Sequence, residues 1–337
     1  MNTKSQKLNS NDIAQLVGVS QATVSRVLSG NGYVSEKTRS RVLKAIKDVE
    51  YQPNTFAQAM RTKQSRTVGV AVSRITNPIV PEILETLSIQ FAAKNRRLVV
   101  WNTDADGEGA ILSAIRQSAV DGIIFTAASH QIEAMDAALK SKIPTVSFNR
   151  YLENSECDQV VSTNFDGAKT IANYLVKHGR ERISFINGPL DRTTLFDREK
   201  GFREGLNTAN ISVPEQYYFQ SEFSQEAFRQ AAIDMMSLPT PPDTISCGND
   251  VIAFAVLNGL KACGVSVPNE VWVTGFDGIE MSGWDVFDLT TMRQPLKQMA
   301  ADAVTALIGR IEGHKGEPKL IQYRTEFCPR GTTANLN

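Results

Sequence analysis

A stretch near the N-terminus, residues 9–29, carries side chains that can form hydrogen bonds with nucleic-acid bases. Gln21, Ala22, Ser25 and Arg26 fall on one face of a predicted helix within this stretch. They are small or can hydrogen-bond, and the guanidinium of Arg26 can donate to both O6 and N7 of a guanine. The spacing therefore predicts a helix face that can read base edges in a DNA groove.

Two short helices joined at a sharp corner would position that face. Asn9 can cap the first helix and Ser20 the second, while Gly18 lies between them, where the corner requires a left-handed backbone. The helices have inward-facing apolar stripes, formed by Ile13, Ala14, Leu16 and Val17 and by Val24, Val27 and Leu28. This pattern is typical of a helix-turn-helix, and an ordinary helical hairpin with a solvated polar face is the alternative.

A third helix is predicted after this pair. Ser35 can cap it, and its apolar residues close a small three-helix core: Val42, Leu43, Ile46 and Val49. The helix ends before Pro53, because the residue that precedes a proline disfavours the helical conformation. Residues 54–66 form either two helical turns or a plain linker, and their residue types alone favour the linker.

The charge of the chain is unevenly distributed. The 337 residues contain 36 basic and 36 acidic side chains, so the net charge is zero. Residues 1–66 hold 11 basic and 4 acidic side chains, which gives this segment a charge of +7 and the remainder −7. A basic head on an acidic body is the charge pattern expected of a DNA-binding module attached to a sensor.

From residue 67 onward, apolar runs rich in β-branched residues alternate with helical patterns. Strands are predicted at 67–72, 98–101, 122–125, 145–148, 182–186, 217–219, 244–247 and 271–276. Helices are predicted at 81–94, 107–117, 132–140, 167–177, 198–208, 225–236 and 251–263. This order predicts parallel sheets in two doubly wound lobes. A final helix at 295–311 and a strand near 321–327 would cross back between the lobes as part of a hinge.

Polar residues follow the predicted strands at the points where the strands end. Ligands of open parallel sheets bind outside the carboxyl ends of the strands. The residues at these ends are Ser73, Thr103, Thr126, Asn149, Arg150, Asn187, Asn249, Asp250 and Asp277. Each one alone can be a turn or cap residue, but together they predict a hydrogen-bonding cleft between the lobes.

Several classes of function have no signal in this sequence. The patterns GxGxxG, GxxxxGK[ST] and GxSxG are absent, and His130, His178 and His314 lie apart from cysteines and carboxylate clusters. We therefore expect no enzyme activity, no catalytic residue, no cofactor and no metal. Scattered cysteines, the lack of an apolar signal segment and the lack of a membrane-spanning run predict a cytoplasmic protein.

The sequence resembles transcription regulators of the lactose-repressor and galactose-repressor (LacI/GalR) family. The densest match is DIAQLVGVSQATVSRVLSGNGYVSEKTRSRVLKAIKDVEYQPNTFAQAMRT. It continues through VGVAVSRITNP, IPTVSFNR, FINGP, DREKGF, GNDVIAFAVLNGLKACGVSVPNEVWVTGFD and LTTMRQPLKQMA, and so covers nearly the whole chain. The resemblance implies an all-α helix-turn-helix head and a two-lobed α/β core with the fold of periplasmic binding proteins.

The resemblance also implies boundaries and a function. The DNA-binding domain would span 1–53, the hinge helix and linker 54–66, and the effector-binding and dimerisation core 67–337. The first lobe would comprise about 67–164 and 294–322, and the second about 165–293 and 323–337. The protein would be a homodimer or tetramer that represses transcription from a pseudo-palindromic operator under the control of a small ligand. The alternative is a cytoplasmic sugar-binding or sugar-metabolising protein of this fold that binds no operator.

Matching positions assign DNA contacts to particular residues. Base reading falls to Gln21, Ala22 and Arg26. Contacts with the DNA backbone or other parts of the DNA fall to Ser20, Thr23, Ser25, Ser29, Tyr33, Ser35, Thr38 and Asn54. Ala57, Gln58 and Met60 match the hinge helix, which in this family orders in the minor groove of the operator. Met60 stands where the family usually has the Leu that wedges into the central base step.

Positions that match the family, together with the strand ends, give the expected effector site. Its residues are Ser73, Thr126, Asn149, Arg150, Arg198, Phe223, Asn249 and Asp277. The charged and amide side chains suit the hydroxyls of a carbohydrate, and Phe223 can stack on a ring face. Arg150 can equally select a sugar acid or a sugar phosphate, and a purine-type effector is a further alternative.

Overall fold

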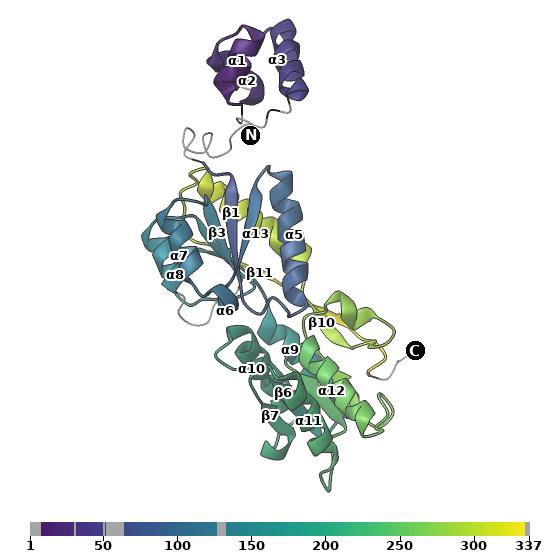
Figure 1. The fold of residues 1–337 in the computed structure, drawn as a ribbon. Coiled ribbons are helices and arrows are strands. Elements are labelled where there is room, and N and C mark those ends of the chain that lie inside the picture. Colours follow the sequence, from purple (N-terminus) through teal and green to yellow (C-terminus); the bar gives the residue numbers. More distant parts are fainter. Residues whose placement is uncertain (1–7, 30–31, 50, 52–63, 127–132, 334–337) are drawn as a thin grey trace. The chain divides into compact units, whose positions relative to one another are not determined.

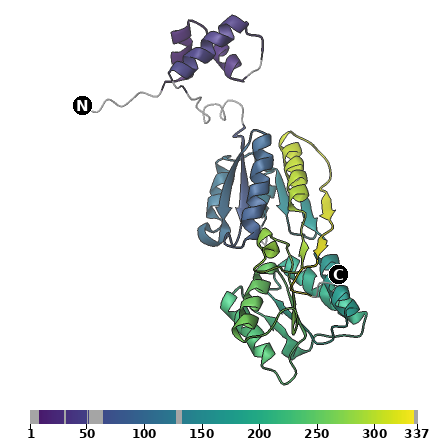
Figure 2. The same cartoon turned by 90° about the vertical axis from the view of Figure 1, so that its right-hand side faces the viewer.

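The computed structural model describes residues 8–29, 32–49, 51, 64–126 and 133–333. The chain divides into two compact units, Met1–Ser65 and Arg66–Asn337. Figures 1 and 2 show a helical N-terminal unit and a larger α/β core.

The N-terminal unit contains the helices α1 (Ser10–Val17), α2 (Gln21–Ser29) and α3 (Glu36–Asp48). Asn9 caps α1 in a capping box, in which Asp12 accepts the backbone N–H of Asn9 at 2.7 Å. Gly18 ends α1 with a φ of 68°, the left-handed conformation expected for the corner. Ser20 and Ser35 accept backbone N–H groups at the starts of α2 and α3, at 3.2 and 3.3 Å. The predicted helix starts and the predicted corner are therefore confirmed.

The core of this unit is smaller than the apolar pattern predicts. Its buried residues are Ile13, Ala14, Val17, Val24, Val27 and Val42. Leu16, Leu28 and Leu43 are 63%, 37% and 48% exposed, so the prediction that they face inward is wrong. Short helices in a three-helix unit each bury only a narrow stripe, and these leucines lie at its edge.

The first lobe of the core is built on a six-stranded sheet of order β11-β5-β4-β3-β1-β2, in which all neighbours are parallel. Its strands are β1 (Thr67–Val72), β2 (Arg97–Asn102), β3 (Gly122–Phe125), β4 (Thr145–Phe148), β5 (Asp158–Ser162) and β11 (Leu320–Tyr323). Helices cover both faces (Figure 1). α5 (Ile79–Ala93) and α13 (Leu296–Ile311) pack on the face that carries Val68 and Val70. α7 (Gly109–Arg116) and α8 (Glu133–Lys140) pack on the other face, and α6 (Thr103–Asp106) follows β2.

The second lobe has a four-stranded parallel sheet of order β7-β6-β8-β9. Its strands are β6 (Ile183–Asn187), β7 (Tyr218–Gln220), β8 (Thr244–Cys247) and β9 (Trp272–Thr274). One face packs against α11 (Gln225–Met236) and α12 (Asp250–Ala262). The other face packs against α9 (Asn164–Lys177) and α10 (Thr193–Asn207). Two 3₁₀ turns, η1 (Glu215–Tyr217) and η2 (Glu280–Gly283), complete this lobe.

The chain passes three times between the two sheets. The passages lie between β5 and α9, between β10 (Thr291–Arg293) and α13, and between β11 and β12 (Glu326–Cys328). β10 and β12 form an antiparallel pair beside the second lobe (Figure 2). The predicted single strand near 321–327 is therefore two strands in different sheets. β5 and β10 are further strands that the sequence pattern did not predict.

Candidate functional site

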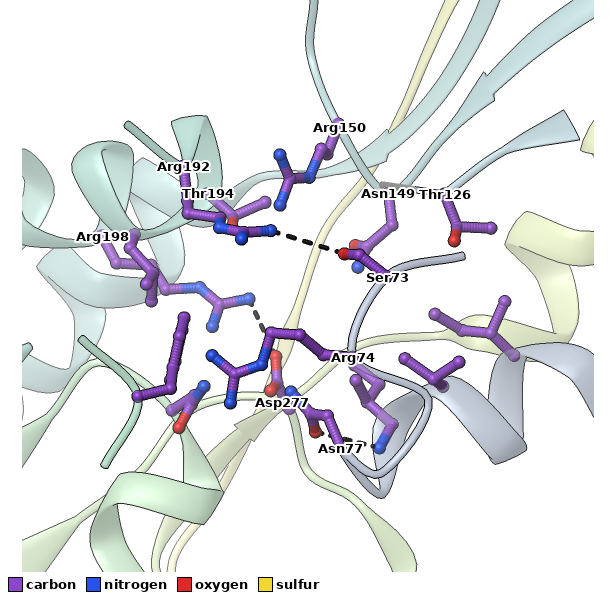
Figure 3. A pocket seen from close by; sticks show the side chains of 16 residues that line it. Ser73, Arg74, Asn77, Thr126, Asn149, Arg150, Arg192, Thr194, Arg198 and Asp277 are labelled. Atoms are coloured by element: carbon purple, nitrogen blue, oxygen red, sulfur yellow. Dashed lines mark hydrogen bonds and ion pairs between the residues drawn. The ribbon is translucent and has the colours of Figure 1, made fainter. Parts of the chain in front are cut away.

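A pocket with a volume of about 90 Å³ lies between the two lobes, at the carboxyl ends of their strands (Figure 3). All eight residues predicted for the effector site line it: Ser73, Thr126, Asn149, Arg150, Arg198, Phe223, Asn249 and Asp277. Four polar residues that sequence reasoning missed line it as well: Arg74, Asn77, Arg192 and Thr194. The strand-end rule predicted six of these residues and the family resemblance added Arg198 and Phe223; the structure brings all eight into one place, although their roles stay predictions.

Arg198 and Asp277 form a buried ion pair in this pocket. Arg198 Nη2 donates to Asp277 Oδ1 at 2.8 Å, and both side chains are at most 6% exposed. Arg198 also donates through Nε to Asn164 Oδ1 at 2.8 Å and through Nη1 to the Gly248 carbonyl at 2.9 Å. Its guanidinium lies over Phe276, 3.9 Å from the ring centroid. Protein acceptors thus occupy most of Arg198, which mainly holds Asp277 in position.

Asp277 belongs to a pair of buried carboxylates. Burial raises the pKa of Asp277 even though Arg198 opposes the shift. Burial, together with the negative charge of Asp277, raises the pKa of Asp250 to about 7. Thr291 donates to Asp250 Oδ1 at 2.6 Å, and Gln294 donates to Asp277 Oδ1 at 2.8 Å. The arrangement therefore favours one negative charge on the pair, and that charge faces the pocket on Asp277.

Three predicted residues make hydrogen bonds or adopt backbone conformations that define what they can offer a ligand. Asn249 Oδ1 accepts the Ile252 N–H at 2.9 Å as the cap of α12, which leaves the amide N–H groups of Asn249 as donors. Thr126 Oγ1 donates to the Ala71 carbonyl at 3.0 Å, which leaves its lone pairs as acceptors. Asn149 has a φ of 63°, and its Oδ1 is buried without a hydrogen-bond partner among the residues described.

Two contacts cross the cleft from one lobe to the other. The guanidinium of Arg74 lies over the ring of Phe223, 3.2 Å from the centroid. Arg192 Nη1 donates to Ser73 Oγ at 3.4 Å, as the dashed line in Figure 3 shows. The ring face of Phe223 that is predicted to stack on a ligand is therefore covered by Arg74.

Three strand-end residues predicted to face the cleft do not line the pocket. Thr103 Oγ1 donates to the Val72 carbonyl at 3.1 Å, and Asn187 Nδ2 donates to Glu199 at 3.1 Å. Asp250 is fully buried. For these three residues the structural alternative, a turn or packing role, is the right one.

The residues predicted to contact DNA lie on and beside α2. Gln21, Ala22 and Arg26 are exposed, and Tyr33 is 93% exposed. Ser20 and Ser35 are exposed, while Thr23, Ser25 and Thr38 are half-buried. The side chain of Ser29 and the hinge positions Asn54, Ala57, Gln58 and Met60 lie outside the described residues.

The described ranges lack two kinds of feature. Within them, no group of three or more His, Cys, Asp or Glu side chains is placed to hold a metal ion. Among the helices of those same ranges, none has the length and apolar character needed to cross a bilayer.

Comparison with known proteins agrees with this architecture. The family described as "Bacterial regulatory proteins, lacI family" matches residues 11–54. The family described as "Periplasmic binding protein-like domain" matches residues 172–333, and the two matches together cover more than half of the chain.

The chain is similar over nearly its whole length to named bacterial repressors. The chain is 26% identical over 329 residues to the HTH-type transcriptional repressor PurR of Vibrio atlanticus, covering 97% of this chain and 98% of that protein. It is 29% identical over 321 residues to the ribose operon repressor of Escherichia coli, covering 94% and 96%. In fold it is similar to the lac repressor dimer bound to operator and the anti-inducer ONPF, with a TM-score of 0.84, 23% identity and coverage of 97% and 99%.

A helix-turn-helix unit joined to a two-lobed, periplasmic-binding-protein-like core defines a DNA-binding transcriptional regulator with a ligand-binding domain. The chain belongs to the lacI family of bacterial regulatory proteins. The predicted fold class and the predicted family are confirmed.

Proposed function

We propose that this protein is a repressor that binds operator DNA and whose operator affinity changes when a small ligand binds between the lobes. One observation carries the proposal: a polar pocket lined by both lobes occurs in a chain that also holds a helix-turn-helix. A ligand that contacts both lobes can favour one arrangement of them. Only such a difference in affinity between two states can shift the DNA-binding equilibrium.

DNA recognition would use the exposed side of α2. Gln21, Ala22 and Arg26 are our candidates for base reading, because all three side chains are exposed on this helix, Gln21 and Ala22 in its first turn and Arg26 in its last. The remaining predicted contact residues would bind the DNA backbone. We place the DNA-binding domain at 1–53 and the hinge segment at 54–66, with Met60 as the candidate wedge.

The ligand would be a carbohydrate or a derivative of one. The buried, unpartnered acceptor Asn149 Oδ1 calls for a donor such as a hydroxyl, and Asn249 offers N–H groups in return. The names of two similar proteins, the ribose operon repressor and the CelR–cellobiose complex, support a sugar. Similarity to the repressor PurR keeps a purine-type effector as the second candidate.

The assembly and location follow from the same proposal. A homodimer would place two recognition helices on the two halves of a pseudo-palindromic operator, and a tetramer is the alternative. The site would work in the cytoplasm by binding alone, without enzyme activity, cofactor or metal. The alternative function is sugar binding or sugar metabolism without an operator.

Selection of bound duplexes from a random DNA library by the purified full-length chain tests the proposal. We expect one enriched palindromic sequence, with affinity that falls steeply as salt rises, because bound phosphates release counterions. Arg26→Ala should weaken binding, whereas Arg116→Gln, at an exposed arginine of the core, should not. Absence of any enriched or salt-dependent binding would favour the alternative function.

A further inference from the structure

Among the described residues that line the interlobe pocket, arginines outnumber carboxylates. Four arginines line it: Arg74, Arg150, Arg192 and Arg198. Asp277 is the one carboxylate among the described lining residues, and it is engaged by Arg198 at 2.8 Å. Three guanidinium groups therefore lack a matching buried carboxylate.

The other three arginines are poorly paired within the described residues. Arg150 is 7% exposed, and its Nη1 has no hydrogen-bond partner there. Arg192 Nε also has no hydrogen-bond partner, and its Asp191 contact is a loose 3.9 Å ion pair to a side chain that is 58% exposed. Arg74 rests on Phe223. Buried charges are costly unless they are paired, so this arrangement needs an explanation.

Nearby acidic residues do not supply the missing partners. Asp104 lies close to Arg74 but accepts its backbone N–H at 2.5 Å, and both Asp104 and Glu222 are exposed at the rim. Burial and the repulsion of Arg192 lower the pKa of Arg74 and the pKa of Arg150 to about 10 each. The guanidiniums stay charged at neutral pH. An anion bound between them would offset the free-energy cost of burying these charges and would reduce the repulsion between them.

The three groups come from both lobes and point into one space. Arg74 follows β1 and Arg150 follows β4, whereas Arg192 precedes α10 of the second lobe. Figure 3 shows the side chains of Arg74, Arg150 and Arg192 directed into the cleft. Guanidinium groups bind planar carboxylates and phosphates through paired hydrogen bonds.

We infer that the effector carries an oxyanion, a phosphate ester or a carboxylate, which binds among Arg74, Arg150 and Arg192. This inference rests on the proposed function and names the class of ligand that the site selects. The anion replaces solvent as the partner of all three guanidiniums. It also links the two lobes, because it contacts Arg74 and Arg150 on one side and Arg192 on the other.

The position of Arg74 adds a role for this residue. Its guanidinium lies over the ring of Phe223, and both residues line the pocket, so a ligand ring that stacks on this face of Phe223 must displace Arg74. An anionic group that draws Arg74 away exposes the ring of Phe223, so that the neutral part of the same ligand can stack on it.

Calorimetric titration of the full-length protein with matched neutral and charged probes tests this inference. The pairs are ribose with ribose 5-phosphate and glucose with glucuronate, and inorganic phosphate is compared with chloride at equal ionic strength. We expect saturable binding of phosphate and at least tenfold tighter binding of the charged member of one pair. The pair that shows the preference distinguishes a phosphate ester from a carboxylate.

Variants connect the preference to the three residues. Arg192→Gln and Arg74→Gln change half-buried side chains and should fold, and each should reduce the charged-to-neutral affinity ratio at least tenfold. Arg150→Gln should do the same, and the exposed control Arg116→Gln, which lies outside the pocket, should leave the ratio unchanged. Equal affinities for charged and neutral probes, no binding of phosphate beyond chloride, or a preference that survives all three variants would overturn the inference. Operator binding by the same preparations, measured separately, shows whether the proposed function holds in that case.

Discussion

Removal of Arg198 is expected to destabilise the core strongly. Arg198→Met keeps much of the side-chain volume but leaves the Asp277 carboxylate buried, with Gln294 as its one remaining side-chain donor among the described residues. It also removes the donors to Asn164 and to the Gly248 carbonyl. Breaking a buried ion pair from one side costs about 3–5 kcal/mol, and we expect a loss of that order at neutral pH.

A substitution of Asp277, the other residue of the ion pair, tests the same interaction from the opposite side. Asp277→Asn alone should also be destabilising, because it leaves the guanidinium of Arg198 buried without its carboxylate. The double variant Arg198→Met/Asp277→Asn should lose less free energy of unfolding than the two single losses added together. The loss in Arg198→Met should also shrink as the pH falls, because the Asp277 carboxyl can then take up a proton.

Urea unfolding followed by tryptophan fluorescence measures these differences. The three tryptophans, Trp101, Trp272 and Trp284, all lie in the unit Arg66–Asn337, so the signal reports on the core alone. Arg116→Gln removes an exposed arginine of the core and serves as the matched control. A loss under about 1 kcal/mol in Arg198→Met, or strictly additive losses in the double variant, would refute a structural ion pair.

Four further variants test other parts of the molecule. Arg26→Ala should cost about 1–3 kcal/mol at one base position of the operator, and uniform weakening over all half-site variants would make Arg26 a phosphate contact. Asp250→Asn should reduce the fall in melting temperature between pH 5 and pH 7, as measured by calorimetry. A melting temperature that depends on pH as steeply as in the unmodified protein would contradict this prediction. Gly201→Ala should destabilise the second lobe by roughly 1–3 kcal/mol, because its Cβ meets the Phe165 carbonyl. Gly309→Ala on α13, whose added Cβ would make an ordinary van der Waals contact with His314 Cβ at 3.8 Å, should be neutral or stabilising in the same denaturation assay.

The sign of the Asp250 prediction follows from its raised pKa. The unfolded chain loses this proton near pH 4, whereas the folded chain keeps it to about pH 7. Between these values the folded state binds more protons, so the contribution of Asp250 to stability is present at low pH and is lost as the pH rises. Asparagine does not titrate, and the variant should lack this part of the pH dependence.

Much of the fold could be predicted because its strands are continuous apolar runs between helical segments. β1, β3, β4 and β8 have the predicted bounds. β5 was not predicted, because Asp158 and Gln159 give its sequence a polar start, although both side chains are buried. Asp158 is neutralised by Arg310 at 2.8 Å, which is 152 positions away in the sequence. No local pattern can reveal such a partner.

The pocket was predictable to the extent that it follows strand ends. Arg74 and Asn77 come just after Ser73 and could have been found by extending the same rule. Arg192 and Thr194 come after the end of β6 by several residues, and only the folded loop brings them to the cleft. The cap role of Asn249 and the covering of Phe223 by Arg74 depend on side-chain positions that sequence alone does not define.

The contacts that cross the cleft determine what any ligand must replace. At the pocket, Arg74 on Phe223 and Arg192 on Ser73 connect the lobes, and outside the pocket the Glu280 N–H donates to Glu82 at 2.8 Å. A ligand that merely added bonds to one lobe would leave the preference between lobe arrangements unchanged, however tightly it bound. A ligand that takes over Arg74 and Arg192 exchanges interlobe contacts of the protein for contacts of its own. The residues that bridge the cleft are therefore the ones through which binding can reach the DNA-binding unit.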